Sequence, residues 1–404
     1  MRIKFLGGCR EVGRNAVLLE TDRRILLDCG VKVETGEIPL PSGKVDAVIL
    51  THPHLDHSGM VPSVRSRVFS TAATLEQADL LLRDSIKVQR SKHLPVYFSE
   101  RDVSRMEKVR VTFGQEFEIG DTLIDIYNSG HVPGSFGVLI DKKLFYTSDF
   151  RLSDTRLLRG ADFDVKNVET MVVESTYAFK EHPPREEVEK MLVEIVEETL
   201  SKNGVVLIPC FAIGRSMEIL MVLDHYDVPC PVYLDGMAKK ALDITLSYPE
   251  FLKDPEALRK AAERAVPIFD HRDRKIALKR PSVVVTTSGM LSGGPIISYL
   301  KKLKNRPECS LVFTGFQVPG TPGRTLLDTG YYRNGTEFKV EMRVEYLDFS
   351  AHADRSELLE FLRKTSPERL IVIHGDECER FAEEVKNDLG IPASAPENGD
   401  TLEV

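Results

Sequence analysis

The stretch that most constrains the fold is a short apolar run followed at once by a cluster of metal-binding side chains. Residues 47–51 read AVILT, the pattern of a buried strand, and residues 52–57 read HPHLDH. Three of the ten histidines therefore fall within six positions, with Asp56 among them. Residues that follow a buried strand lie in a loop at its carboxyl end, where α/β proteins commonly place functional sites. The stretch predicts an α/β fold with a metal site at a strand end.

Four side chains in this loop, His52, His54, Asp56 and His57, are more than one tetrahedral ion can comfortably bind. Two ions sharing the stretch are the better geometry, and imidazole and carboxylate groups suit zinc or a related metal. The competing interpretation is a solvated polar loop. That interpretation would be preferred for any single histidine, but not for HxHxDH directly after a strand. We therefore predict a dinuclear metal site.

Two ions need further ligands, and three more candidates follow apolar runs elsewhere in the chain. His131 follows DIYNSG, Asp149 follows LFYTS, and His374 follows LIVI. Each adjoins small residues that allow close approach to a shared centre, although each alone could equally be a turn or capping residue. Asp28, in RILLDCG, is either a turn aspartate before glycine or a carboxylate that orients a ligand histidine or metal-bound water.

Composition limits the class of protein. With 404 residues and 42% hydrophobic content, the chain can form two domains or one elaborated domain. The net charge of −8 argues against a protein that holds nucleic acid by overall positive potential, so any polyanion site must be a local patch. The six cysteines form no CxxC pair, which favours reduced thiols. Neither a signal-peptide core nor a run of about 18 apolar residues is present, so we expect a cytoplasmic protein without a membrane partner.

The pattern of strands and helices changes near residue 180. Before it, the chain predicts mostly strands, with one helical pattern that extends from about residue 58 to 90. From residue 185 a long amphipathic helix is followed by alternating strands and helices, which predicts a second α/β unit with a parallel sheet. The tail reads strand over 342–350, then helix, strand and helix. These parts follow one another without a linker, as is typical when one domain is inserted into another.

Four of these stretches resemble the successive motifs of metallo-β-lactamase-fold hydrolases: LLDCG, THPHLDHSG, NSGHVPGS and YTSDF. Three later stretches, VVESTY, DFSAHAD and VIHGD, resemble motifs A, B and C of the β-CASP nucleases, and the resemblance covers essentially the whole chain. It implies an αββα sandwich into which an α/β β-CASP domain is inserted. The domains expected from it are residues 1–179 and 346–404 for the metallo-β-lactamase domain and residues 180–345 for the insert.

The resemblance also implies a zinc-dependent ribonuclease. A histidine in motif C, here His374, is associated with RNA-processing members, whereas DNA-repair members usually carry valine there. The chain looks most like the archaeal cleavage and polyadenylation specificity factor-type ribonucleases, although its motif C reads HGD where HGE is commoner. We expect hydrolysis of RNA by a hydroxide activated between two metals, leaving 5′-phosphate and 3′-hydroxyl ends. Internal cleavage and 5′→3′ trimming use the same chemistry, so the cutting mode stays open.

The roles of individual residues follow from the same resemblance. One zinc is expected on His52, His54 and His131, and the other on Asp56, His57 and His374, with Asp149 bridging them. His352 of motif B would protonate the leaving 3′-oxygen, since an imidazole pKa suits general acid catalysis at neutral pH. Glu174 of motif A would keep His352 charged and oriented. The alternative for His352 is a structural position beside a helix N-cap.

RNA must also be held, and the expected insert carries basic residues in a chain that is acidic overall. They are Arg259, Lys260, Arg264, Arg272, Arg274, Lys275, Lys279, Arg280, Lys301, Lys302 and Lys304. They could track phosphates or simply form solvated helix faces. Better candidates for phosphate contact are Arg215 and the turn of Ser292, Gly293 and Gly294, because glycine-rich turns expose backbone N–H groups. The expected partner is single-stranded RNA. A homodimer and an RNA-processing or transcription complex are further expectations from the family.

Two other functions compete with a ribonuclease. A metallo-β-lactamase-fold hydrolase of a small substrate would share the first four motifs, but not Glu174, His352 and the insert. A non-catalytic RNA-binding scaffold would typically have lost metal ligands, and none of the expected ligands is missing here. Metal analysis together with an RNA cleavage assay separates the three functions.

Overall fold

The computed structural model describes residues 1–91 and 94–404, which form two compact units. The first unit contains Met1–Asp154, Gly160–Glu181 and Ala351–Val404. The second unit contains Thr155–Arg159 and His182–Ser350. The second unit therefore interrupts the sequence of the first, which the chain completes after it returns at residue 351.

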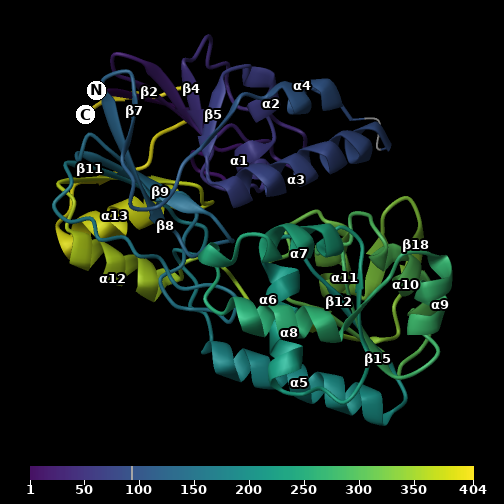
Figure 1. Ribbon diagram of the computed structural model, residues 1–404. Helices are drawn as coiled ribbons and strands as arrows, with labels where there is room; N and C mark the ends of the chain where they lie inside the picture. Colours follow the sequence, from purple (N-terminus) through teal and green to yellow (C-terminus); the bar gives the residue numbers. More distant parts are fainter. Residues whose placement is uncertain (92–93) are drawn as a thin grey trace. The chain divides into compact units, whose positions relative to one another are not determined.

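Two seven-stranded sheets form the centre of the first unit (Figure 1). Sheet A has the strand order β22 (Thr401–Glu403), β1 (Arg2–Gly7), β2 (Ala16–Glu20), β3 (Arg24–Leu27), β4 (Ala47–Ile49), β5 (Arg67–Ser70) and β6 (Lys108–Arg110). Sheet B has the order β21 (Ala393–Ser394), β20 (Arg369–Ile373), β11 (Thr170–Glu174), β10 (Leu144–Tyr146), β9 (Phe136–Ile140), β8 (Thr122–Asn128) and β7 (Phe117–Ile119). The first and last strands of the chain, β1 and β22, pair in antiparallel register.

Alternating side chains of these strands build separate apolar layers, as the two-residue period of a strand requires. In β2, Val17 and Leu19 lie in the core between the two sheets, whereas Leu18 lies in a second core on the other face of sheet A. The second core also holds residues of α3 (Ala72–Ser91). A third core joins sheet B to α12 (Arg355–Thr365) and α13 (Cys378–Leu389). The result is an αββα sandwich, with the short helices α1 (Leu55–Ser58), α2 (Val61–Val64) and α4 (Glu100–Arg105) near α3 (Figure 1).

The second unit is organised around an all-parallel six-stranded sheet. Its strand order is β14 (Ala265–Pro267), β13 (Val232–Asp235), β15 (Ser282–Thr286), β12 (Val205–Pro209), β16 (Ser310–Phe313) and β19 (Arg343–Tyr346). The central strands β12 and β15 are buried along their whole length, as is usual for parallel sheets covered by helices. The connections are α5 (Arg185–Ser201), α6 (Arg215–His225), α7 (Ala238–Leu246), the 3-10 turn η1 (Pro249–Phe251), α8 (Pro255–Arg264), α9 (His271–Ala277), α10 (Ile296–Leu303), α11 (Pro322–Thr329) and the hairpin β17 (Tyr331–Arg333)–β18 (Glu337–Lys339).

These two architectures confirm the α/β fold class that the sequence predicts, an αββα sandwich with an inserted parallel α/β unit. One predicted element is wrong: the single helical pattern expected from about residue 58 to 90 is interrupted by β5. Arg65 adopts a left-handed conformation (φ 56°), which ends α2 and lets the next residues turn into the sheet. The four-residue strand RVFS is too short to show its own period between two helical patterns.

The limits of the two units also differ from the expected domain limits of 179/180 and 345/346. Strand β19 straddles position 345 and pairs with β16 of the second unit. Residues 155–159 belong to the second unit because Arg156 and Leu157 bond there, Arg156 to the Glu189 carboxylate and both backbone amides to the Glu218 carboxylate. Single-sequence patterns do not reveal such contacts, because the partners lie far apart along the chain.

The structure bears on two expectations from composition, the state of the cysteines and the lack of a membrane span. All six cysteines are free thiols. Across residues 1–91 and 94–404, none of the helices combines the length and apolar character that a bilayer span requires.

Candidate metal centre and active site

Four loops of the first unit carry the expected metal ligands. His52, His54, Asp56 and His57 follow β4 of sheet A, and the last two of these lie within the one-turn helix α1, which begins at Leu55. The other three follow strands of sheet B. His131 lies between β8 and β9, Asp149 follows β10, and His374 follows β20. Residues from both sheets thus meet at one edge of the sandwich, although up to 322 positions (374 − 52) separate them in sequence.

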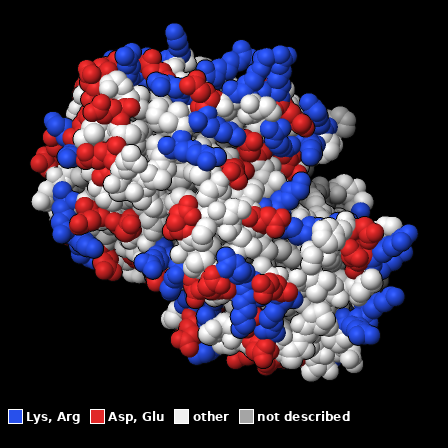
Figure 2. Space-filling model, viewed as in Figure 1, with Lys and Arg blue, Asp and Glu red and all other residues white. Residues whose placement is uncertain are grey.

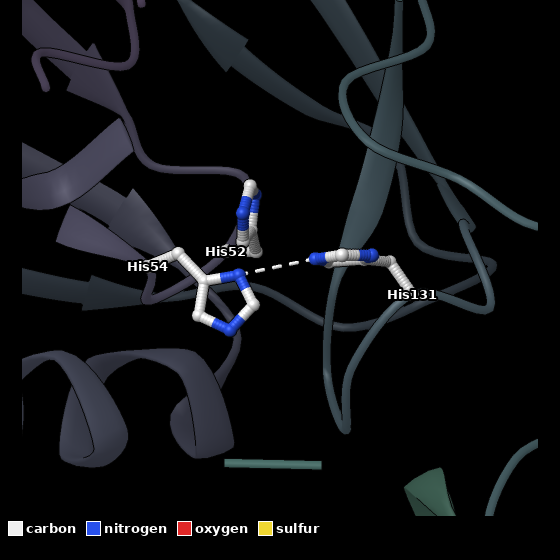
Figure 3. Close-up of side chains that lie close together, drawn as sticks. All are labelled: His52, His54 and His131. Atoms are coloured by element: carbon white, nitrogen blue, oxygen red, sulfur yellow. Dashed lines mark hydrogen bonds between the residues drawn. The ribbon is translucent and has the colours of Figure 1, made fainter. Parts of the chain in front are cut away.

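His52, His54 and His131 form one compact group, with one nitrogen of each ring within 4.8 Å of the others. Figure 3 shows the three rings facing a common point, and the dashed line joins His131 Nε2 to His54 Nδ1 at 3.1 Å. The other nitrogen of His131, Nδ1, lies 2.9 Å from the carbonyl oxygen of Ala351. That carbonyl can only accept a hydrogen bond, so Nδ1 carries the proton and Nε2 presents a lone pair to the group.

Asp56, His57, Asp149 and His374 form a second group, again with ligand atoms within 4.8 Å of one another. His374 Nε2 lies 3.7 Å from Asp56 Oδ2 and 3.6 Å from Asp149 Oδ1. Asp149 is also 3.5 Å from His52 Nε2 and 3.8 Å from His131 Nε2. Its carboxylate therefore borders both groups.

The burial, the missing hydrogen-bond partners and the protonation of these side chains fit a cation-binding site. His52 Nε2 and both ring nitrogens of His374 are buried without a hydrogen-bond partner among the described residues. Such orphaned polar atoms are rare in proteins unless an ion or water binds them. Burial, together with neighbouring imidazoles, lowers the pKa of His52, His54 and His131, so these rings are neutral and their lone pairs are available. A buried set of imidazoles and carboxylates is the donor chemistry of zinc.

Asp28 holds one ligand of the second group in place. Its fully buried carboxylate accepts hydrogen bonds from Thr51 and Tyr146 and lies 2.8 Å from His57 Nδ1. This contact turns His57 Nε2 toward Asp149, 3.4 Å away. Burial alone would lower the pKa of His57, but Asp149 and Asp28 outweigh that effect and raise it. Asp28 is therefore a buried carboxylate that orients His57, and not simply a turn residue before a glycine.

The backbone at this edge is shaped to bring the loops together. Asp28, Ser148 and His374 all have positive φ angles, of 57°, 53° and 52°, which non-glycine residues seldom adopt. A Cβ atom on Gly30 would lie 1.6 Å from the carbonyl oxygen of Asp56, so only glycine allows this approach of the two loops. Uncommon backbone conformations of this kind concentrate at functional sites.

His352 and Glu174 form a hydrogen-bonded pair beside the expected ligands. His352 Nδ1 lies 3.0 Å from Glu174 Oε1, and the buried carboxylate also accepts from the Thr176 amide. The His352 and His131 rings are 4.6 Å apart between centroids. Burial acts to lower the pKa of His352, but the negative charge of Glu174, followed by Asp149 and Asp56, raises it to about 9. The contact with Glu174 therefore favours the protonated form of the His352 ring.

Comparisons with known proteins identify the family of the chain. Successive parts of the chain match the metallo-beta-lactamase superfamily (residues 9–169), the Beta-Casp domain (residues 216–326) and the Zn-dependent metallo-hydrolase RNA specificity domain (residues 337–396). The chain is 35% identical to the protein named probable RNase MJ4 of Methanocaldococcus jannaschii, and the match covers 100% of both chains. The chain belongs to the β-CASP family of metallo-β-lactamase-fold hydrolases.

Two further similarities place this β-CASP protein among its relatives. The transcription termination factor FttA of Pyrococcus abyssi is 35% identical to it, over 100% of this chain and 71% of the relative. A crystal structure titled as a protein of unknown function from Enterococcus faecalis V583 has a TM-score of 0.65, covers 99% of both chains and is 18% identical. At that identity the second similarity concerns the fold alone. The family is Zn-dependent, and the chain carries clusters of histidine and aspartate side chains that could bind metal.

The residues expected to contact RNA lie elsewhere, in the second unit of this β-CASP protein. Arg215 is the first residue of α6, and its guanidinium donates a hydrogen bond to the carbonyl of Thr314. In the turn, the Ser292 carbonyl accepts from Asn334 at 3.3 Å and the Gly293 carbonyl from Ser288 at 3.2 Å. Gly294 adopts φ 77°. The turn is thus held by its carbonyl groups.

The basic residues expected between positions 259 and 304 divide into ion-paired and unpaired side chains, apart from Lys304, whose ammonium lies 4.7 Å from the centroid of the Phe338 ring. Four form ion pairs: Arg264 with Asp224 and Asp227, Arg274 with Asp235, Lys260 with Asp224, and Arg259 with Glu256. Within the described chain, no ion pair involves the exposed side chains of Arg272, Lys275, Lys279, Arg280, Lys301 and Lys302. On the face shown in Figure 2, cationic and anionic side chains are interspersed. A run of basic residues in the sequence therefore does not by itself predict a basic surface patch, because acidic side chains can pair with those residues.

Sequence reasoning missed several groups that complete the centre. Asn15 lies 3.4 Å from His57 Nε2 and donates to Tyr146, which in turn donates to Asp28. Thr51 anchors the Asp28 carboxylate, and its place directly before His52 is the only signal that could have revealed it. No sequence signal could have identified the Ala351 carbonyl, because every residue carries a backbone carbonyl.

Proposed function

We propose that the chain is a zinc-dependent ribonuclease that hydrolyses single-stranded RNA and leaves 5′-phosphate and 3′-hydroxyl ends. The observation that carries the proposal is the juxtaposition of a paired histidine, His352, with metal-ligand side chains: a nitrogen of His352 lies within 4.8 Å of ligand atoms of His131 and Asp149. RNA as the substrate is supported by the match to an RNA specificity domain over residues 337–396 and by a full-length relative named as an RNase.

In this proposal two zinc ions are held, one by each ligand group. His52, His54 and His131 would hold one ion, and Asp56, His57 and His374 the other, while Asp149 would be shared because its carboxylate borders both groups. When bound, zinc supplies Lewis acidity toward a phosphate oxygen and ionises water near neutral pH, so the nucleophile needs no strong protein base. Asp28 keeps His57 turned toward the centre, and the Ala351 carbonyl does the same for His131.

The residue proposed as general acid is His352. A 3′-alkoxide is a poor leaving group, so it needs a proton as its bond to phosphorus breaks. The Nδ1 atom of His352 faces Glu174, which leaves Nε2 as the atom that would donate this proton. Glu174 is anchored by the Thr176 amide and fixes both the orientation and the charge of the ring. Glu174 is therefore a positioning residue, whereas His352 acts on the substrate.

RNA contacts and partners complete the proposal. The turn of Ser292, Gly293 and Gly294 would offer amides to a phosphate, and the unpaired cations of α9 and α10 would add salt-dependent attraction. Arg215 would act mainly by holding the loop after β16, because its guanidinium bonds the Thr314 carbonyl. A relative of this chain is named as a transcription termination factor, which supports a place in a transcription or RNA-processing complex. A homodimer remains part of the proposal on family grounds.

A cleavage assay on labelled RNAs tests the function. The protein, with its zinc content measured, is incubated with one RNA sequence in three forms: 5′-phosphate, 5′-triphosphate and circular. Products with 5′-phosphate and 3′-hydroxyl ends are expected, and cutting of the circle would assign endonuclease action. Preference for the 5′-phosphate form with release of mononucleotides would assign 5′→3′ trimming. A zinc-loaded protein that cuts none of the three RNAs would contradict the proposal and favour a small-substrate hydrolase or a scaffold.

A further inference from the structure

The five residues that lead into His352 carry contacts that the ligand assignment does not use. We call residues 348–352, DFSAH, the strap. Along the strap the chain leaves the second unit at Ser350 and enters the first unit at Ala351. Each half of the strap is held within its own unit, and the two halves are joined by a single peptide bond.

The first half is fixed by side chains at the start of the second unit. Asp348 Oδ2 lies 3.2 Å from His182 Nδ1, and both side chains are nearly inaccessible, at 6% and 3% exposure. The other carboxylate oxygen of Asp348 accepts from the Ser350 amide at 3.0 Å. Arg185 donates to the Ser350 carbonyl at 2.7 Å, and its guanidinium lies over the Phe349 ring, 5.2 Å from the centroid. Buried contacts therefore fix three consecutive residues of the strap.

The second half meets the metal centre. The Ala351 carbonyl holds His131 Nδ1 at 2.9 Å, and His352 Nδ1 pairs with Glu174 at 3.0 Å. The next amide, of Ala353, donates to the Phe150 carbonyl at 2.6 Å, directly after Asp149. One metal-ligand histidine and the proposed general acid are therefore oriented by two neighbouring residues of the strap.

We propose that Arg185, and with it the His182–Asp348 pair, are positioning residues that set the orientation of His131 and His352 through the strap. The carbonyls of Ser350 and Ala351 belong to adjacent planar peptide groups, so releasing the first lets the second shift or rotate. A rotation of the Ala351 peptide removes the acceptor that fixes the tautomer of His131. The same rotation displaces the His352 ring from the Glu174 carboxylate.

The consequence is that the inserted unit takes part in the chemistry without supplying a ligand or an acid. Arg185 opens α5, the first helix of the second unit, and His182 is the first residue of its main segment. Removing a direct hydrogen-bond partner of a metal ligand typically changes metal affinity or activity about 10- to 100-fold, and Arg185 acts one step further out, so the expected effect is smaller, up to about 10-fold. The effect on His131 concerns metal binding alone, whereas the effect on His352 rests on the proposed ribonuclease function.

The test compares Arg185→Met with Arg156→Met. Methionine keeps an apolar stem but cannot donate to Ser350. Arg156 is the matched control: it lies in the same unit, bonds the Glu189 carboxylate and lies over the Tyr226 ring, 5.5 Å from its centroid, but forms no hydrogen bond or ion pair with the strap. Zinc affinity is measured by titrating zinc into metal-free protein against a chromophoric chelator. We expect Arg185→Met to weaken one zinc site by up to about 10-fold, and Arg156→Met to leave both sites unchanged.

Kinetics on the labelled RNA provide the second readout. Arg185→Met is expected to lower kcat by about the same factor while KM stays unchanged, and Arg185→Lys, which can still donate to Ser350, is expected to recover most of it. In a His352→Ala background with zinc at saturation, Arg185→Met should have a smaller further effect on kcat, because only its effect through His131 remains. Equal zinc affinity and equal kcat for Arg185→Met and Arg156→Met would overturn the proposal, as would a change confined to KM.

A second variant and the separate zinc readout keep the outcome interpretable. If Arg185→Met has a collapsed thermal unfolding transition, Asp348→Asn is used instead, because it removes the charge that faces His182 and keeps the side-chain shape. Asp348→Asn with wild-type zinc affinity and wild-type kcat overturns the proposal on its own. If the wild-type protein binds zinc but cuts no RNA, the proposed function fails, and the zinc titrations still decide the role of Arg185 toward His131.

Discussion

The metal centre of the first unit and the basic segment of the second unit, residues 259–304, are both rich in ionisable side chains, yet they are in opposite states. In the metal centre, His52 and His374 keep buried ring nitrogens without a hydrogen-bond partner among the described residues. In the basic segment, Arg264 and Arg274 already have acidic partners at 2.8 and 2.7 Å. Unsatisfied buried groups imply a missing ligand, whereas neutralised surface groups do not. Density of charge in a sequence does not distinguish these states.

The largest effect is expected from Asp149→Asn, because this carboxylate borders both ligand groups. Without its charge, four neighbouring imidazoles remain around the centre, and cation binding weakens at both groups. We expect zinc content to fall and turnover to drop by about 10³-fold or more, since metal-ion catalysis contributes several kcal/mol and each 1.36 kcal/mol is tenfold. Zinc is measured by elemental analysis and turnover by RNA cleavage.

The control for this variant is Asp164→Asn, which changes a carboxylate of the same unit whose side chain is 84% exposed. It should retain full zinc and full turnover. Asp149→Asn with wild-type zinc content and near wild-type turnover would contradict the view that the orphaned nitrogens mark a cation site.

The next effect is expected from His352→Ala, which separates catalysis from metal binding. General acid catalysis typically contributes about 10²–10⁴-fold, so turnover should fall by that range while zinc content stays nearly unchanged. Glu174→Gln should lower turnover less, because the amide can still hold the ring but not its charge. Single-turnover cleavage measures both. His271→Ala, an exposed histidine at the start of α9, is the control. Loss of both zinc ions from His352→Ala would refute its role as an acid outside the ligand set.

The contrast between the two regions also explains which structural features could be predicted from the sequence. Strands such as AVILT and the ligands behind them follow local rules, because a buried strand has a two-residue or fully apolar pattern and its loop carries the side chains. The roles of Arg264 and Arg274 depend on Asp224 and Asp235, which lie about 40 positions earlier (264 − 224 = 40; 274 − 235 = 39). The Ala351 carbonyl and β5 could not be predicted from the sequence, for related reasons. A backbone carbonyl is not specific to any residue type, and a strand of four residues is too short to show a periodic pattern.

A moderate effect is expected from Asp28→Asn, which tests orientation rather than ligation. The variant keeps the size of the side chain but loses the charge that holds His57 Nδ1 at 2.8 Å. Removing such a partner of a ligand typically costs about 10- to 100-fold in metal affinity or activity. Zinc titration against a chelator should therefore show weaker binding at one site. Asp22→Asn, at a more exposed turn of the same sheet, should bind zinc as the wild type does. Equal zinc affinity for the two variants would mean that His57 needs no orienting carboxylate.

The smallest effect is expected in the basic segment, and it compares paired with unpaired cations. Each phosphate contact made by a cation adds about 0.7 to the slope of log affinity against log salt for single-stranded nucleic acid. Lys301→Ala combined with Lys302→Ala, on the exposed face of α10, should reduce that slope by about 1 to 1.5 if both contact RNA. Arg264→Ala should leave the slope unchanged, because Asp224 and Asp227 already occupy its guanidinium at 2.8 and 3.0 Å. The measurement is RNA binding by a catalytically inactive His352→Ala protein across a salt series. A larger change for Arg264→Ala than for the lysine pair would show that RNA displaces the acidic partners, and that ion pairing in the free protein does not predict which cations bind RNA.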